Sequence, residues 1–138
     1  AVELQLHHSI HGVGAYAGSC DGLMLVNDDV VLIDYKTKRH GKRVLPKFCE
    51  QQRLQMAAYS LAISHLYEDQ LPAPVTRTSL LFAHPEDGKP VTVVSTQGDL
   101  LLEYQQKWVD LLGQWYEVHG EQVADEQTIF DEQLELSV

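Results

Sequence analysis

The feature that most constrains the fold is an apolar run at residues 30–33 (VVLI) that ends in the charged triplet Asp34-Tyr35-Lys36. Apolar residues at consecutive positions, rather than at alternate ones, are typical of a strand that is covered on both faces. Such a strand lies inside a sheet, and the charged residues at its end mark an opening. Residues 30–36 therefore predict a central strand that carries Asp34 and Lys36 to one point.

A second acidic residue, Asp21, lies on the preceding β-prone segment, and the only turn-like cluster between the two segments is 27–29 (NDD). We therefore expect a hairpin. If its loop consists of the first two residues of the cluster, Asp21 falls opposite Asp34; if it consists of the last two, Asp21 falls opposite Lys36. Both registers put the three charged side chains on one face. A three-residue loop without a bulge would put Asp21 on the other face.

Two carboxylates that converge repel each other unless a cation neutralises them. Asp21 and Asp34 together would therefore hold a hard divalent cation such as Mg²⁺ or Mn²⁺. Such a cation polarises a phosphate and lowers the pKa of an attacking water, while Lys36 orients that water or stabilises negative charge. This pattern indicates phosphodiester hydrolysis. The alternative is a surface hairpin with an ordinary Asp-Lys pair, because short acid-x-Lys matches are common.

The segment from Pro46 to Tyr67 predicts a helix, since proline is tolerated in the first turn and apolar residues follow at near-helical spacing. Gln51, Gln55 and Tyr59 recur at every fourth position, so they form a polar and aromatic stripe that can face the carboxylates. An amide can bond to phosphate, and a tyrosine ring can stack on a base. Without the strand motifs, the same segment would be an ordinary amphipathic helix.

In these motifs the chain resembles the PD-(D/E)XK nuclease superfamily, and most closely its RecB-like branch, which includes phage and mitochondrial single-strand exonucleases. The matching residues are Gly18-x-x-Asp21, Ile33-Asp34-Tyr35-Lys36-Thr37 and Gln55-x-x-x-Tyr59. The resemblance covers roughly residues 1–67 by motif and the remainder by general pattern. It implies an α/β fold: a mixed central β-sheet flanked by helices, with a restriction-endonuclease-like core.

The resemblance also implies the roles of the site residues. Asp21 and Asp34 bind the metal, Mg²⁺ or Mn²⁺, with the Tyr35 carbonyl as a further ligand. Lys36 is the catalytic lysine. The remaining two, Gln55 and Tyr59, lie beside the active site and contact the nucleic acid.

One part of the family pattern has no counterpart in residues 1–138. Relatives usually carry a further His or Glu ligand on a helix well upstream of the Gly-x-x-Asp motif, and we expect this leading helix to be missing. Either the chain is a fragment or another residue substitutes. Glu3 resembles a Glu that relatives place before the glycine strand, and His7, His8 and His11 are nearby alternatives. Spacing selects none of them.

Charge is unevenly distributed along the chain. A formal net charge of -10 argues against a protein that coats nucleic acid indiscriminately. Six of the ten basic residues nevertheless lie between residues 36 and 47, at and directly after the end of the central strand: Lys36, Lys38, Arg39, Lys42, Arg43 and Lys47. We expect Lys38, Arg39, Lys42 and Arg43 to bind the nucleic-acid backbone, the alternative being a solvated loop.

The rest of the chain bounds the domain. Residues 75–82 and 91–95 predict a hairpin that extends the sheet, because strong turn residues separate them. Residues 100–118 predict a long amphipathic helix whose aromatic residues lie in the core. The acidic, Gln-rich segment from about residue 120 to 138 predicts a mobile tail. With this length we expect residues 1–138 to form a single domain.

The composition also indicates where the protein acts. There is no run of about 18 apolar residues and no secretory signal, so we expect no membrane association. Cys20 and Cys49 cannot form the four-cysteine iron–sulfur site of some RecB-like relatives, so no iron–sulfur cluster is expected. Both cysteines are expected to be reduced. We therefore expect a cytoplasmic protein of bacterial or phage origin.

These observations favour a metal-dependent DNA exonuclease that acts on DNA with single-stranded ends, in recombination, repair or phage DNA processing. The preference for exonuclease over endonuclease action comes from the resemblance alone. A first alternative is a catalytically inactive module of the same fold that binds nucleic acid or protein within a larger assembly. A second is an α/β ligand-binding domain in which the Asp-x-Lys match is accidental.

Overall fold

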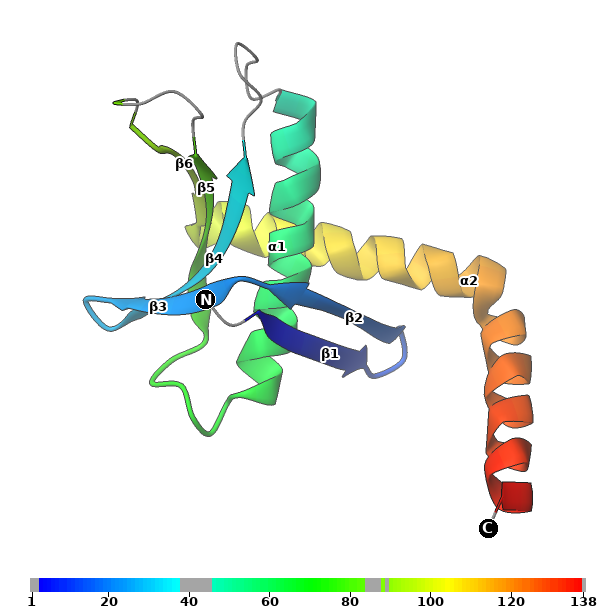
Figure 1. The fold of residues 1–138 in the computed structure, drawn as a ribbon. Helices are drawn as coiled ribbons and strands as arrows, with labels where there is room; N and C mark the ends of the chain where they lie inside the picture. Colours follow the sequence, from blue (N-terminus) through cyan, green and yellow to red (C-terminus); the bar gives the residue numbers. More distant parts are fainter. Residues whose placement is uncertain (1–2, 38–45, 84–87, 89, 138) are drawn as a thin grey trace.

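The computed structural model describes residues 3–37, 46–83, 88 and 90–137, with side chains up to residue 120. Its elements, in chain order, are β1 (Leu4–Ile10), β2 (Gly14–Cys20), β3 (Gly22–Val26), β4 (Asp29–Thr37), α1 (Pro46–Leu66), β5 (Val75–Ala83), β6 (Thr92–Gln97) and α2 (Gly98–Ser137). Figure 1 shows the strands with both helices beside them. The α/β class expected from the sequence is confirmed.

A four-stranded mixed sheet forms the centre of the fold, with the strand order β3-β4-β5-β6. The pairing of β4 with β5 is parallel, and the two outer pairings are antiparallel. The hairpin predicted from residues 75–82 and 91–95 is the β5–β6 pair. β4 is an inner strand, and all residues from Val30 to Asp34 are buried. This confirms the central strand predicted from the consecutive apolar run.

The segment preceding the hairpin loop is divided, where the sequence predicts a continuous strand. β2 ends at Cys20 and pairs with β1, whereas β3 begins at Gly22 and pairs with β4. Asp21 lies at the bend between them, and in Figure 1 the β1–β2 hairpin extends to one side of the larger sheet. The change of partner therefore places Asp21 where two sheets meet.

Asn27 and Asp28 form the turn between β3 and β4. Their φ angles are 52° and 71°, and the flanking residues Val26 and Asp29 pair with each other. Positive φ at both central residues is typical of a type I′ turn, which Asn and Asp tolerate better than most residues. Of the three registers left open by the sequence, this is the one that places Asp21 opposite Asp34, one position beyond the pair of Gly22 with Ile33.

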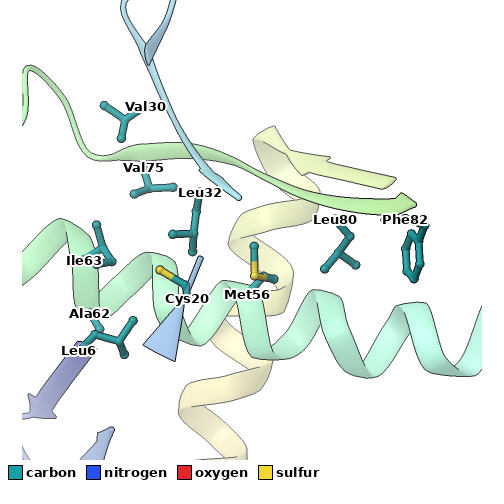
Figure 2. Packing of buried hydrophobic residues seen from close by; sticks show 10 residues of the cluster. All are labelled: Leu6, Cys20, Val30, Leu32, Met56, Ala62, Ile63, Val75, Leu80 and Phe82. Carbon is teal, nitrogen blue, oxygen red and sulfur yellow. The ribbon is translucent and has the colours of Figure 1, made fainter. Parts of the chain in front are cut away.

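Helix α1 covers one face of this sheet and ends within one residue of the predicted boundary. Figure 2 shows its side chains packed against those of β4 and β5. The buried cluster consists of Leu6, Cys20, Val30, Leu32, Met56, Ala62, Ile63, Val75, Leu80 and Phe82. Leu32 and Asp34 are two residues apart on β4, so they share the face that α1 covers. The carboxylate therefore lies at the edge of this core.

Helix α2 differs from its prediction in length and in the burial of its aromatic residues. It runs from Gly98 to Ser137, so the predicted mobile segment after residue 120 is helical, and Figure 1 shows its last part extending away from the sheet. Trp115 is 46% exposed, so the expectation that it lies in the core is wrong, although Trp108 and Tyr116 are half-buried. Neither helix within the described ranges is long and apolar enough to cross a membrane.

Candidate active site

Asp21 is tied to the neighbouring strand by its own carboxylate. Because it lies at the bend between β2 and β3, its backbone is outside the regular ladder of both strands. Its Oδ2 accepts a hydrogen bond from the backbone N–H of Tyr35 at 2.7 Å. A charge-assisted bond of this length fixes the carboxylate against β4.

Asp34 and Lys36 lie next to Asp21 on the same face of the sheet. They are two residues apart on β4, and the Lys36 Nζ lies 2.7 Å from the Asp34 Oδ2. The Asp34 side chain is 12% exposed and that of Lys36 is 27% exposed. The structure thus brings together the two carboxylates and the ammonium group that the sequence placed on one face, at a point that solvent reaches.

The two carboxyl groups are close enough to share a hydrogen bond. That hydrogen bond lowers the pKa of Asp21, and the Tyr35 N–H lowers it further. Burial raises the pKa of Asp34, and the hydrogen bond with Asp21 raises it further, although Lys36 opposes this rise. The arrangement is that of a carboxyl pair that holds a proton more readily than two separate carboxylates would. A divalent cation could replace that proton and neutralise both groups.

The donor set fits Mg²⁺ or Mn²⁺, which prefer oxygen ligands. Mg²⁺ often binds through one or two carboxylates, with water and substrate phosphate completing its coordination. Asp21 and Asp34 supply two such groups. Within the described part of the chain, no cluster of three or more His, Cys, Asp or Glu side chains could hold a metal ion. The candidate protein ligands in this part of the chain are therefore the carboxylate pair, and the family resemblance adds the Tyr35 carbonyl as an expected further ligand.

Tyr59 borders the carboxylates from α1. Burial raises the pKa of its hydroxyl, the charge of Asp34 raises it further, and Gln55 and the backbone of Ser19 are its polar neighbours. Its ring packs against the bare α-carbon of Gly18. The Gln and Tyr of the predicted stripe therefore lie beside the carboxylates, with Gln55 exposed to solvent.

The residues considered as substitutes for an upstream ligand lie in different places. Glu3 accepts a hydrogen bond from the Ser19 hydroxyl at 2.8 Å. The ring of His8 contacts that of His65 on α1, and its Nδ1 is 3.0 Å from the hydroxyl of Tyr16 on β2, while His7 and His11 are exposed. None of these four residues joins the carboxylates in a metal-binding cluster.

All four predicted backbone-binding residues fall in the segment between β4 and α1. Lys38, Arg39, Lys42 and Arg43 lie outside the described residues. Of the same basic group, Lys36 is part of the site and Lys47 is exposed in the first turn of α1.

The sequence reasoning did not identify Phe48. It shares a helical stripe with Gln55 and Tyr59, at positions i, i+7 and i+11, and this spacing is visible in the sequence. The missed signal was that an aromatic residue extends the polar stripe towards the start of the helix.

The two cysteines have no evident part in this site. Both are free thiols in the structure. Cys20 is buried beside the carboxylates, and burial raises its pKa to about 11, with the charges of Asp34 and Asp21 adding to the effect. Such a thiol stays protonated and unreactive at neutral pH.

The chain matches a known protein family. A family model described as the PD-(D/E)XK nuclease superfamily matches residues 5–132. The match spans the carboxylate pair, the lysine, α1 and most of α2. No curated protein matches the chain.

Proposed function

Because the chain belongs to the PD-(D/E)XK nuclease superfamily, we propose that it is a metal-dependent DNA exonuclease of the RecB-like type. Membership of the superfamily indicates nuclease activity. The RecB-like and exonuclease assignments come from the sequence motifs described above. We further propose that it acts on single-stranded ends, in recombination, repair or phage DNA processing, in the cytoplasm of a bacterium.

The observation that carries this proposal is the convergence of Asp21, Asp34 and Lys36. Asp21 and Asp34 would hold Mg²⁺ or Mn²⁺, and the Tyr35 carbonyl would be a further ligand. When bound, a divalent cation supplies positive charge to the scissile phosphate and acidifies water near it. The direction of the pKa of Asp34 is consistent with this: burial raises it and the hydrogen bond with Asp21 raises it further, so a nearby cation would stabilise the charged carboxylate.

The remaining groups of the site position the substrate. The Lys36 ammonium, held by Asp34, lies where it can donate hydrogen bonds to the attacking water or to a phosphate oxygen that gains charge. The Gln55 amide and the Tyr59 hydroxyl can donate to neighbouring phosphate oxygens. The N–H of Tyr35 keeps Asp21 aimed at the same point.

A cleavage assay tests the proposal. End-labelled single-stranded and duplex DNA, and circular single-stranded DNA, are incubated with Mg²⁺, Mn²⁺ or EDTA. We expect cleavage of the linear strands that requires metal, is lost in Lys36→Ala and spares the circle. Lys107→Ala is the matched control, because Lys107 is an exposed lysine paired with Glu50 on another surface. Cleavage of the circle would contradict the exonuclease assignment, and cleavage by Lys36→Ala would contradict the catalytic role.

The second candidate is a catalytically inactive module of the same fold. The observation in its favour is that the described residues supply two acidic ligands and no third. Such a module would bind single-stranded DNA without cutting it under any of the metal conditions. Tight binding by the wild-type chain, with no product in Mg²⁺ or Mn²⁺, would therefore favour this candidate.

A further inference from the structure

Phe48 is a large aromatic residue that stays partly exposed near the start of α1. It lies in the first turn of the helix and is 39% exposed. Its ring makes an edge-to-face contact with Phe82, with ring centroids 6.2 Å apart and an angle of 65° between the planes. Phe82 itself is only 2% exposed. The pair is therefore anchored in the core through Phe82, while Phe48 remains accessible.

This aromatic pair lies beside β4, the strand that carries Asp34 and Lys36. Phe82 on β5 is the direct partner of Lys36 on β4. Figure 2 shows Phe82 at the arrowhead end of β5, over the N-terminal half of α1. Because Phe48, Gln55 and Tyr59 occupy one stripe of α1, the exposed ring continues the surface that borders the carboxylates.

Packing alone does not require an exposed phenylalanine here. Large apolar residues gain their free energy of burial by leaving water, and Phe48 retains more than a third of its accessible surface. An accessible aromatic ring next to a phosphodiesterase site is suited to stacking on a nucleobase. Base stacking tolerates any sequence, because every base has a π-face.

We propose that Phe48 stacks on an unpaired base that flanks the scissile phosphate, and that it is thereby a specificity-determining residue for single strands. The proposal rests on the proposed function, since it concerns the substrate of that site. A base inside a duplex is covered on both faces by its neighbours, so it can reach Phe48 only when the strand is unpaired. The ring therefore favours single-stranded DNA over duplex DNA.

Two substitutions at this position separate stacking from packing. Phe48→Leu keeps an apolar contact with Phe82 but removes the aromatic ring, whereas Phe48→Trp keeps an aromatic face. We expect Phe48→Leu to weaken binding of a single-stranded oligonucleotide, measured in Ca²⁺ to prevent cleavage, by about tenfold, and Phe48→Trp to restore it. Trp115→Leu is the matched control, because Trp115 is an exposed aromatic residue on α2 and is expected to have no effect.

A series of oligonucleotides with one abasic residue moved along the strand locates the stacked base. For the wild-type chain, an abasic residue at one position near the cut should weaken binding about as much as Phe48→Leu does. In Phe48→Leu the same lesion should cost nothing further, because the ring and the base act as one pair. The inference would be overturned if the losses of binding caused by the abasic residue and by Phe48→Leu simply added. Unchanged single-strand binding by Phe48→Leu would overturn it as well.

The outcomes separate this inference from the proposed function. A wild-type chain that cuts DNA with metal, together with a Phe48→Leu variant that binds and cuts like it, contradicts the stacking role alone. A wild-type chain that does not cut, but whose single-strand binding depends on Phe48, contradicts nuclease activity and leaves the aromatic contact standing. A chain that neither binds nor cuts single strands contradicts both.

Discussion

The ring of Tyr59 lies so close to Gly18 that no side chain fits between them. A Cβ atom added to Gly18 would be 2.5 Å from Cε1 of Tyr59 and 2.8 Å from its hydroxyl oxygen. Glycine is needed here for space, and the contact joins α1 to β2 three residues before Asp21. It explains physically why the glycine and the tyrosine of the two sequence motifs belong together.

Gly18→Ala should therefore reduce both stability and activity. The added methyl group must displace the Tyr59 ring, and overpacking of this kind costs about 1–3 kcal/mol. We expect urea unfolding to show that loss, and DNA cleavage to fall as the ring moves away from the carboxylates. Gly22→Ala is the matched control, because no atom lies within 4 Å of a Cβ at that position. Equal losses in the two variants would contradict the steric explanation.

The turn at Asn27 and Asp28 offers a stabilising change. Both residues have positive φ, and glycine adopts this conformation without the steric strain of a side chain. We expect Asp28→Gly to raise the free energy of unfolding by about 0.5 kcal/mol, and Asp28→Val to lower it by about 1 kcal/mol. Denaturant titration checks both. If valine is as well tolerated as glycine, the turn is not of the proposed type and the register that pairs Asp21 with Asp34 loses its support.

His8 should make the stability of the β1–α1 contact depend on pH. Burial lowers its pKa below 6.5, and the ring of His65, with its centroid 4.9 Å away, lowers it further. The folded chain therefore binds this proton less tightly than the unfolded chain does. The full free energy of unfolding is therefore present above about pH 6.5. It decreases as the pH falls below that value, because the unfolded chain takes up the proton first.

We expect the urea concentration at the unfolding midpoint to decrease when the pH is lowered from about 7.5 to about 5.5. The substitution His65→Gln should make this decrease smaller. The groups that face His8 are Tyr16 on β2 and His65 on α1. A steeper fall in His65→Gln than in the wild-type chain would show that the neighbouring histidine does not repel the charge on His8.

Asp34→Asn should remove the effect of metal on stability. A ligand that binds only the folded chain raises its unfolding temperature. We expect Mg²⁺ or Mn²⁺ to raise the melting temperature of the wild-type chain and to leave that of Asp34→Asn unchanged. Asp110→Asn is the control, because Asp110 is an exposed acid on α2. The same metal-induced shift in the wild-type chain and in Asp34→Asn would place the cation elsewhere.

The sequence was most informative where the determining signal is local. The apolar run before Asp34 predicts an inner strand. The NDD cluster predicts the hairpin loop, and both of its two-residue loops put Asp21 on the same face as Asp34 and Lys36. The boundaries of α1 follow from proline tolerance and helical spacing. In each case neighbouring residues carry the physical cause, so no knowledge of distant contacts is required.

The sequence was least informative where the structure depends on partners far along the chain. The division of one β-prone segment at Asp21 follows from pairing with β1 on one side and β4 on the other. No local signal specifies such a change of partner. Similarly, the position of Glu3 beside Ser19 comes from the β1–β2 register, which spacing alone could not select.

Helix α2 shows a different failure of prediction. The sequence predicts a helix only as far as residue 118 and a mobile segment after about residue 120, but that segment is rich in Glu and Gln, which have high intrinsic helix propensity. That propensity agrees with the continuation of the helix to Ser137. The exposure of Trp115 was also missed, because an amphipathic pattern does not show where the covering sheet ends.

The central claim is that Asp21 and Asp34 together hold a divalent cation, and anomalous scattering tests it most directly. Crystals of the wild-type chain soaked in Mn²⁺ are measured at the manganese absorption edge, alongside crystals of Asp34→Asn. We predict one strong peak within bonding distance of both carboxylates in the wild type and none there in the variant. Bound manganese at other positions only, with no peak between Asp21 and Asp34, would contradict the account.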